Sequence, residues 1–139
     1  MPCYNDGTVV AECHRRLAAA FAPLAISYEC IYVDDGSRDP TWLQFSKLHE
    51  QFPHNTVAVT LSRNFGHQSA VSTGLSLTRG KVAVIIIDAD LQDPPELIPP
   101  TIDTWRQGNE VVYGVRSSLV GHQPTLRRRN PVPKSEISR

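Results

Sequence analysis

Apolar and polar residues alternate along the chain in two ways, with stretches of helical spacing separated by short apolar runs. Apolar residues that recur every three or four positions predict helices over residues 8–21, 40–52, 68–79 and 94–107. Short runs rich in β-branched residues predict strands over residues 28–33, 56–62, 82–87 and 110–116. Because helices and strands alternate, we expect an α/β fold with a mostly parallel sheet and helices on both faces.

The run at residues 82–87 contains only apolar side chains, as expected of a central strand that is buried on both faces. Three acids, Asp88, Asp90 and Asp93, follow it directly. Because unpaired carboxylates are costly to bury, this strand should end at the crevice where open α/β sheets bind ligands. The alternative is a solvated turn before a helix, in which Asp93 caps the helix that begins at Pro94. That role needs only one acid. We therefore favour Asp88 and Asp90 as hard oxygen ligands for Mg²⁺ or Mn²⁺.

A second acidic pair, Asp34 and Asp35, follows the strand predicted at residues 28–33. Gly36 comes next and permits a tight turn, so turn chemistry alone is one interpretation of the pair. The other interpretation is a ligand contact for one of the two acids. We favour it because two acidic strand ends would meet at the same edge of a parallel sheet.

The strand predicted at residues 56–62 ends in Arg63, which precedes a glycine-containing loop and the start of a helix. A guanidinium group and helix N–H groups both favour an anion such as phosphate. His67 lies in the same stretch, and a hydrogen-bonded surface role explains this histidine more simply than a catalytic one.

The formal net charge of the chain is zero, so composition gives no argument for a nucleic-acid partner. Residues 1–116 hold 9 Lys and Arg against 13 Asp and Glu, an acidic balance that is compatible with a cation-using site. The three cysteines have no metal-type spacing and are expected to be reduced thiols in a cytoplasmic setting. We find no signal-peptide pattern and no apolar run long enough for a transmembrane segment.

Periodicity is lost after residue 116, and residues 117–139 hold 5 Lys and Arg against 1 Glu. Several prolines and few apolar residues predict a polar, disordered tail, so the expected domains are residues 1–116 and this tail. The arginine run at residues 127–129 is most simply solvated, with contact to phosphate or an anionic membrane as the alternative.

Four motifs stand in order along the chain: Pro-x-Tyr-Asn-Asp at residues 2–6, Val-Asp-Asp-Gly-Ser at residues 33–37, Leu-Ser-Arg-Asn-Phe-Gly-His at residues 61–67 and Asp-Ala-Asp-Leu-Gln-Asp-Pro-Pro at residues 88–95. At these spacings the chain resembles the family 2 glycosyltransferases over residues 2–116, and most closely the polyprenyl-phosphate and dolichyl-phosphate sugar transferases. The resemblance implies a Rossmann-like GT-A fold. It also implies an inverting enzyme that moves a sugar from a UDP- or GDP-sugar to a polyprenyl or dolichyl phosphate.

The resemblance also implies roles for single residues in binding the donor. Pro2 and Tyr4 would border the nucleotide base, and Asp35 would accept a hydrogen bond from it, with Asp34 supporting that turn. Arg63 would face the donor diphosphate.

Asp88, Asp90 and Gln92 would surround a Mg²⁺ or Mn²⁺ ion, with the two aspartates counted as catalytic. Such an ion neutralises charge that develops on the leaving nucleoside diphosphate. The acceptor phosphate is already an anion, so the reaction needs positioning more than deprotonation, which accounts for the lack of an obvious His or Glu base.

The sequence departs from this family at both ends. The first strand, which precedes Pro2 in the family, is expected to be missing, and so is the acceptor-side region after Arg116. An inactive, truncated fragment of such an enzyme is therefore an alternative function. For an active enzyme, the expected partners are a nucleotide sugar and a lipid phosphate at the cytoplasmic face of a membrane.

A phospho-accepting signalling domain is a more distant alternative, because it too places an acidic pocket at strand ends. It would need a lysine near Val115, where this chain has Arg116.

Overall fold

The computed structural model describes residues 1–80, 82–115 and 125–129, and the chain divides into two compact units, Met1–Glu96 and Leu97–Arg139. The first unit contains β1 (Pro2–Cys3), α1 (Val10–Phe21), η1 (Ala22–Leu24), β2 (Cys30–Asp34), α2 (Thr41–Gln51), β3 (Thr56–Thr60) and α3 (His67–Ser76). A short 3-10 turn, η2 (Pro95–Leu97), bridges the boundary, and the second unit contains α4 (Ile98–Arg106), β4 (Val111–Val115) and β5 (Thr125–Arg129).

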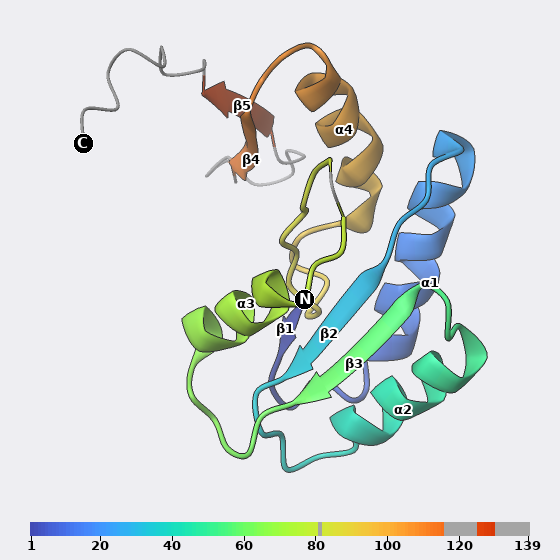
Figure 1. Ribbon diagram of the computed structural model, residues 1–139, viewed down its shortest axis with the longest axis vertical. Coiled ribbons are helices and arrows are strands. Elements are labelled where there is room, and N and C mark those ends of the chain that lie inside the picture. Colours follow the sequence, from blue (N-terminus) through green and yellow to red (C-terminus); the bar gives the residue numbers. More distant parts are fainter. Residues whose placement is uncertain (81, 116–124, 130–139) are drawn as a thin grey trace. The chain divides into compact units, whose positions relative to one another are not determined.

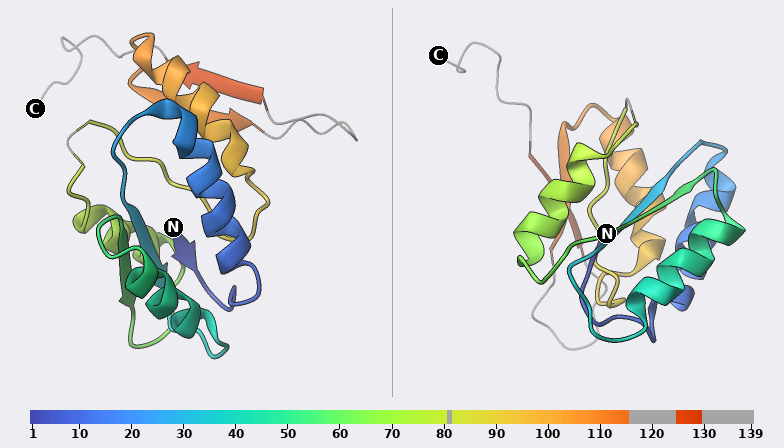
Figure 2. Two further views of the ribbon diagram at one scale, coloured as in Figure 1. Left: turned by 90° about the vertical axis from the view of Figure 1, so that its right-hand side faces the viewer. Right: turned by 60° about the horizontal axis from the view of Figure 1, so that its bottom comes forward.

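The sheet of the first unit has the order β1-β2-β3, and both strand pairs are parallel. In the β2–β3 ladder the register runs from Cys30 opposite Thr56 to Asp34 opposite Thr60. Helices α1 and α2 lie on one face of this sheet and α3 lies on the other (Figure 1), an arrangement that the turned views of Figure 2 also show. The prediction of a parallel α/β sheet with helices on both faces is confirmed.

β2 forms the centre of this unit, and all five of its residues are buried. Successive side chains of a strand point to opposite faces, so β2 contributes to two packed layers. Ile31 and Val33 pack with Ala70 of α3 on one face. On the other face, the Tyr32 ring lies 4.9 Å from the ring of Phe45 on α2, measured between centroids.

His14 of α1 is buried against this second layer. Its Nδ1 atom lies 2.7 Å from the Tyr32 hydroxyl oxygen, and its ring centroid lies 4.8 Å from that of Phe52. Cys3, Cys13 and Cys30 are also buried in this unit, one each on β1, α1 and β2, and all three thiols are free.

β1 corrects one expectation, because the first strand is not wholly missing. Pro2 and Cys3 pair in parallel with Val33 and Asp34 of β2. The Asp35 N–H donates to the Cys3 carbonyl oxygen at 2.8 Å, and the Met1 amino group donates to the Ile31 carbonyl oxygen at 2.8 Å. The start of the chain is therefore tied to the central strand.

The strand predicted at residues 82–87 is not formed in the structure. Neither ladder of the three-stranded sheet includes it, and the exposed fractions of Val82, Val84 and Ile86 are 74%, 50% and 55%. Ile87, at its end, is buried. The prediction was wrong because an apolar pattern favours an extended backbone but does not supply the hydrogen-bonding neighbour that a strand requires.

The second unit contains a two-stranded antiparallel sheet. The strand predicted at residues 110–116 is present as β4, but its partner is β5, with Val111 opposite Arg129 and Val115 opposite Thr125. β5 corrects the prediction of a disordered tail for residues 125–129; the remaining tail residues lie outside the described ranges. The compact units also divide after Glu96 rather than after residue 116.

Helix α4 begins at Ile98, so Pro99 and Pro100 occupy its first turn. Proline is tolerated there because the first N–H groups of a helix have no intrahelical partner. Among the described residues, no helix is both long enough and apolar enough to cross a membrane.

Candidate functional site

The carboxyl ends of β1, β2 and β3 lie at one edge of the sheet, because the three strands are parallel. Three loops leave the strands at this edge: residues 4–7 after β1, residues 35–40 after β2 and residues 61–66 after β3. These loops contain Tyr4, Asp35 and Arg63, three of the residues that the sequence singled out, and hydrogen bonds join the loops to one another.

The first two loops are joined to each other. The Asn5 N–H donates to the Ser37 hydroxyl at 2.8 Å, and the Arg38 N–H donates back to Asn5 Oδ1 at 2.9 Å. Asp39 accepts N–H groups from Gly7 at 2.9 Å and from Thr41 at 3.0 Å. This network fixes the chain around Tyr4, whose side chain is exposed, whereas Pro2 is buried within β1.

Asp34 is the last residue of β2, and its side chain is buried. Its Oδ1 atom accepts the Ser37 N–H at 2.9 Å, and its Oδ2 atom accepts the Thr60 hydroxyl at 3.2 Å. Asp34 therefore closes the turn after β2 and ties this turn to the end of β3.

Asp35 is buried as well, with 3% of its surface exposed. Its Oδ1 atom accepts the Phe65 N–H at 2.7 Å, and its Oδ2 atom accepts the Gly66 N–H at 2.9 Å. Both carboxylate oxygens thus bond the backbone of the loop after β3. Nearby, the Arg63 guanidinium lies over the Phe65 ring, 4.5 Å from its centroid, and both side chains are exposed.

His67 begins α3 and joins this loop to the acidic motif after residue 87. Its Nε2 atom lies 3.1 Å from Asp88 Oδ1, and both side chains are substantially exposed. Asp90 Oδ1 accepts the Gln92 N–H at 2.9 Å, across a turn in which Leu91 has φ of +63°. This left-handed conformation is uncommon for a residue with a side chain such as leucine.

The carboxylates near this motif influence one another. Burial raises the pKa of Asp6, and the neighbouring charges of Asp90, Asp39 and Asp88 raise it further, against a hydrogen bond from the Tyr4 N–H. Negative charge gathered in this way favours a nearby cation.

The fit of a divalent ion follows from these donors. Asp88 and Asp90 offer hard carboxylate oxygens, yet among the described residues no group of three His, Cys, Asp or Glu side chains is assembled to hold a metal ion. Mg²⁺ commonly uses one or two carboxylates and completes its shell with substrate phosphates and water. The residues therefore fit an ion that arrives with a diphosphate, rather than one held in a cage of protein ligands alone.

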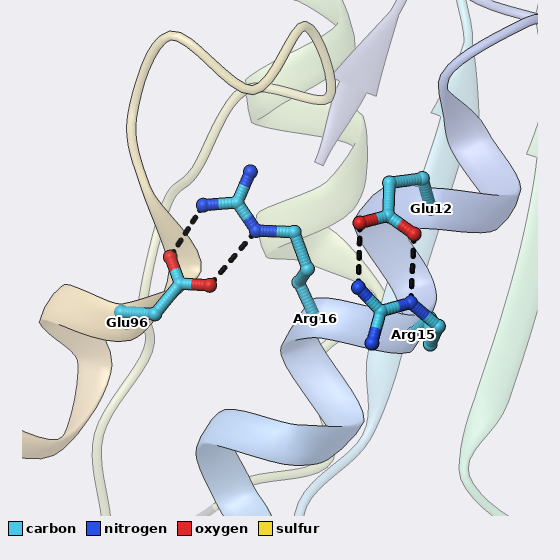
Figure 3. Close-up of polar contacts among 4 residues, drawn as sticks. All are labelled: Glu12, Arg15, Arg16 and Glu96. Carbon is cyan, nitrogen blue, oxygen red and sulfur yellow. Dashed lines mark hydrogen bonds and ion pairs between the residues drawn. The ribbon is translucent and has the colours of Figure 1, made fainter.

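An ion pair fixes the far end of the acidic motif to helix α1 (Figure 3). The Arg16 guanidinium donates from Nε to Glu96 Oε1 at 2.8 Å and from Nη2 to Glu96 Oε2 at 2.5 Å. The neighbouring Glu12–Arg15 pair in the same view lies within α1 alone. Arg16 thus connects α1 to the residue that follows Pro94 and Pro95.

Sequence reasoning missed three of these contacts: Asp35 to the loop backbone, His67 to Asp88 and Arg16 to Glu96. The first had a usable signal, because Gly36 marks a place where two backbones approach closely, and a Cβ atom there would clash with the backbone of Arg63. The contacts of His67 with Asp88 and of Arg16 with Glu96 join residues far apart in the chain, and no local sequence pattern predicts them.

Comparison with known proteins places these observations in a family. The family described as Glycosyl transferase family 2 matches residues 1–137, a span that includes most of the predicted tail. The uncharacterized glycosyltransferase YkcC of Bacillus subtilis is 40% identical over 87% of this chain, and the uncharacterized glycosyltransferase sll0501 of Synechocystis sp. is 45% identical over 87%.

An undecaprenyl-phosphate 4-deoxy-4-formamido-L-arabinose transferase of Erwinia tasmaniensis is 43% identical over 85% of this chain. The matched regions cover 37%, 37% and 36% of these three relatives, respectively. The chain therefore spans little more than a third of the length of the curated relatives it matches.

Proposed function

Because this chain belongs to glycosyl transferase family 2, we propose that its Met1–Glu96 unit binds the nucleotide-sugar donor of a glycosyltransferase. In the whole reaction, an inverting transfer moves the sugar from a UDP- or GDP-sugar to a polyprenyl phosphate at the cytoplasmic face of a membrane. The name of the Erwinia tasmaniensis relative, which specifies undecaprenyl phosphate, supports this class of acceptor.

The observation that carries the proposal is the contact between His67 and Asp88. It brings the loop that contains Arg63 together with the Asp-x-Asp motif at the carboxyl edge of a parallel sheet. A diphosphate needs positive charge near its oxygens, and a cation bridging to carboxylates and an arginine are the two usual sources.

Each part of the donor then has a proposed neighbour. Tyr4, which is exposed beside β1, and Pro2 border the base, with Asp34 and Asp35 at the adjoining turn after β2. The guanidinium of Arg63 is exposed and can bond diphosphate oxygens.

Asp88 and Asp90, with Gln92, would hold the divalent cation. When bound, this ion supplies positive charge that offsets the charge developing on the leaving diphosphate. The acceptor phosphate is itself an anion, so the protein has to orient the two reactants and does not have to remove a proton.

Calorimetric titration of the purified chain with UDP and with GDP, each with and without Mn²⁺, tests the proposal. We expect one nucleotide to bind, with an affinity that depends on Mn²⁺, and Asp90→Ala to abolish that dependence. Asp103→Ala is a matched control, because Asp103 is an exposed aspartate of α4 that pairs with Arg106. Absence of nucleotide binding by the folded chain would favour an inactive fragment.

A further inference from the structure

The Asp35 carboxylate bonds the loop after β3 through both of its oxygens. The donors are two consecutive backbone N–H groups, those of Phe65 at 2.7 Å and Gly66 at 2.9 Å. Hydrogen bonds from an N–H to a charged carboxylate are stronger than those between neutral groups. Only 3% of Asp35 is exposed, so water competes little for these bonds.

Gly36 brings the same two segments into direct backbone contact. It has φ of +70°, and a Cβ atom at this position would lie 2.4 Å from the Arg63 carbonyl carbon and 2.6 Å from Arg63 Cα. No side chain fits at such distances. The turn after β2 is therefore shaped to receive the backbone of residues 63–66.

This loop presents two groups to the proposed donor site. At its start, the Arg63 guanidinium lies over the Phe65 ring, and immediately after it His67 contacts Asp88. A displacement of the loop would therefore move both Arg63, which is proposed to bind the diphosphate, and His67, which contacts Asp88.

We infer that Asp35 is a positioning residue, which holds residues 63–67 so that Arg63 and Asp88 face the same diphosphate. Its role is exerted through the backbone N–H groups of Phe65 and Gly66 rather than through the nucleotide base. The inference rests on the proposed function for its ligand, but the loop geometry that it describes can be tested without any ligand.

Asp35→Asn is the informative change, because it keeps the size of the side chain and replaces one acceptor oxygen with an NH₂ donor. One of the two backbone N–H groups then loses its acceptor on residue 35. Among the described residues, the Phe65 N–H has no other acceptor, whereas the Gly66 N–H also donates to Asn64 Oδ1 at 3.0 Å. Asp39→Asn is the matched control, since Asp39 also accepts two backbone N–H groups, those of Gly7 and Thr41, in a different loop.

The ligand-free measurement is NMR spectroscopy of the whole chain. We expect Asp35→Asn, and not Asp39→Asn, to speed hydrogen exchange at the Phe65 and Gly66 amides and to shift the ring resonances of His67. In the unsubstituted protein, scalar coupling across the hydrogen bond between Phe65 N and the Asp35 carboxyl carbon tests the contact even if the variant fails to fold. Unchanged exchange in Asp35→Asn, or an absent coupling, would overturn the inference.

The second measurement uses inorganic pyrophosphate with Mn²⁺, a probe that has no base. Supporting groups around metal sites typically contribute about 10- to 100-fold in affinity, so we expect Asp35→Asn to weaken pyrophosphate binding by about tenfold or more. A variant that loses affinity for UDP or GDP but binds pyrophosphate normally would show that Asp35 reads the base, against the inference. If the unsubstituted chain binds neither probe, the proposed function fails, and the NMR result alone decides the role of Asp35.

Discussion

His14 is a residue whose burial makes the fold sensitive to acid. Burial lowers the pKa of His14 below its ordinary value, whereas in the unfolded chain this residue titrates near pH 6.5. As the pH falls below that value, the unfolded state binds a proton that the folded state does not, so His14 favours unfolding progressively until its lowered folded-state pKa is reached.

We therefore expect urea unfolding to give a lower free energy of unfolding at pH 5.5 than at pH 7.5. One proton of difference between the two states corresponds to about 1.4 kcal/mol per pH unit. In His14→Gln the decrease should be smaller, although the loss of the Tyr32 contact also lowers stability at both pH values. An equal pH dependence in both proteins would contradict this assignment to His14.

Phe65 acts on the side chain of Arg63. An exposed cation–π contact contributes about 0.5–1 kcal/mol, so Phe65→Leu should free the guanidinium and weaken nucleotide binding by roughly two- to fivefold. Phe65→Tyr retains an aromatic face and should bind like the unsubstituted protein in the same calorimetric titration. Equal affinities of the leucine and tyrosine variants would rule out this role for the ring.

Among the structural elements, α1 and the segment that ends at Glu96 are joined by the Arg16 ion pair (Figure 3). The side chain of Glu96 is 58% exposed, so solvent screens the pair despite its two hydrogen bonds. A double-mutant cycle of Arg16→Ala and Glu96→Ala, measured by urea unfolding, should therefore give only a small coupling energy. The Glu12–Arg15 pair is the control within one helix, and a much larger coupling for Arg16 would mean that this pair is effectively desolvated.

The segment of residues 82–86 is a second element with a testable property. Val82, Val84 and Ile86 are exposed, and an exposed run of apolar, β-branched side chains promotes association between chains. Val84→Lys should therefore raise the monomer fraction, measured by light scattering at increasing concentration. Leu43→Lys adds the same charge at an exposed position on α2, and an equal gain from that control would show that charge alone is responsible.

The segment of residues 82–87 also shows which strands could be predicted from the sequence and which could not. β2 and β3 were found because each has an apolar pattern and also a hydrogen-bonded neighbour. Residues 82–87 have the stronger pattern but no ladder partner, and the arginine-rich β5 has a partner in β4 but a poor pattern. Local composition shows which residues prefer a strand, whereas the formation of a strand also depends on a partner segment elsewhere in the chain.

The candidate site divides in the same way. The sequence placed Asp34 and Asp35 at the end of β2 and Arg63 just after β3, because position along a parallel sheet can be read from the pattern, and their roles in binding stay predictions. The bonds from Asp35 to Phe65 and Gly66 were not predictable, because a carboxylate accepts hydrogen bonds equally well from a ligand or from the backbone.

At the scale of the whole molecule, the charge balance and the coverage of the relatives bear on the proposed function. The acidic balance of residues 1–116 fits a cation-dependent donor site, while the chain spans little more than a third of its curated relatives. The calorimetric titrations therefore test the proposed donor binding and do not test sugar transfer.

The three buried thiols can report on local opening of the part of the protein that contains them. Burial raises the pKa values of Cys13 and Cys30 to about 11, so neither forms appreciable thiolate at pH 8, and Cys3 is shifted in the same direction for the same reason. A thiol reagent should consequently label β1, α1 and β2 only during moments when this part of the protein opens. The labelling rate would measure how often this part of the protein opens. A nucleotide that binds only the closed protein should slow labelling by a factor of one plus its free concentration divided by its Kd.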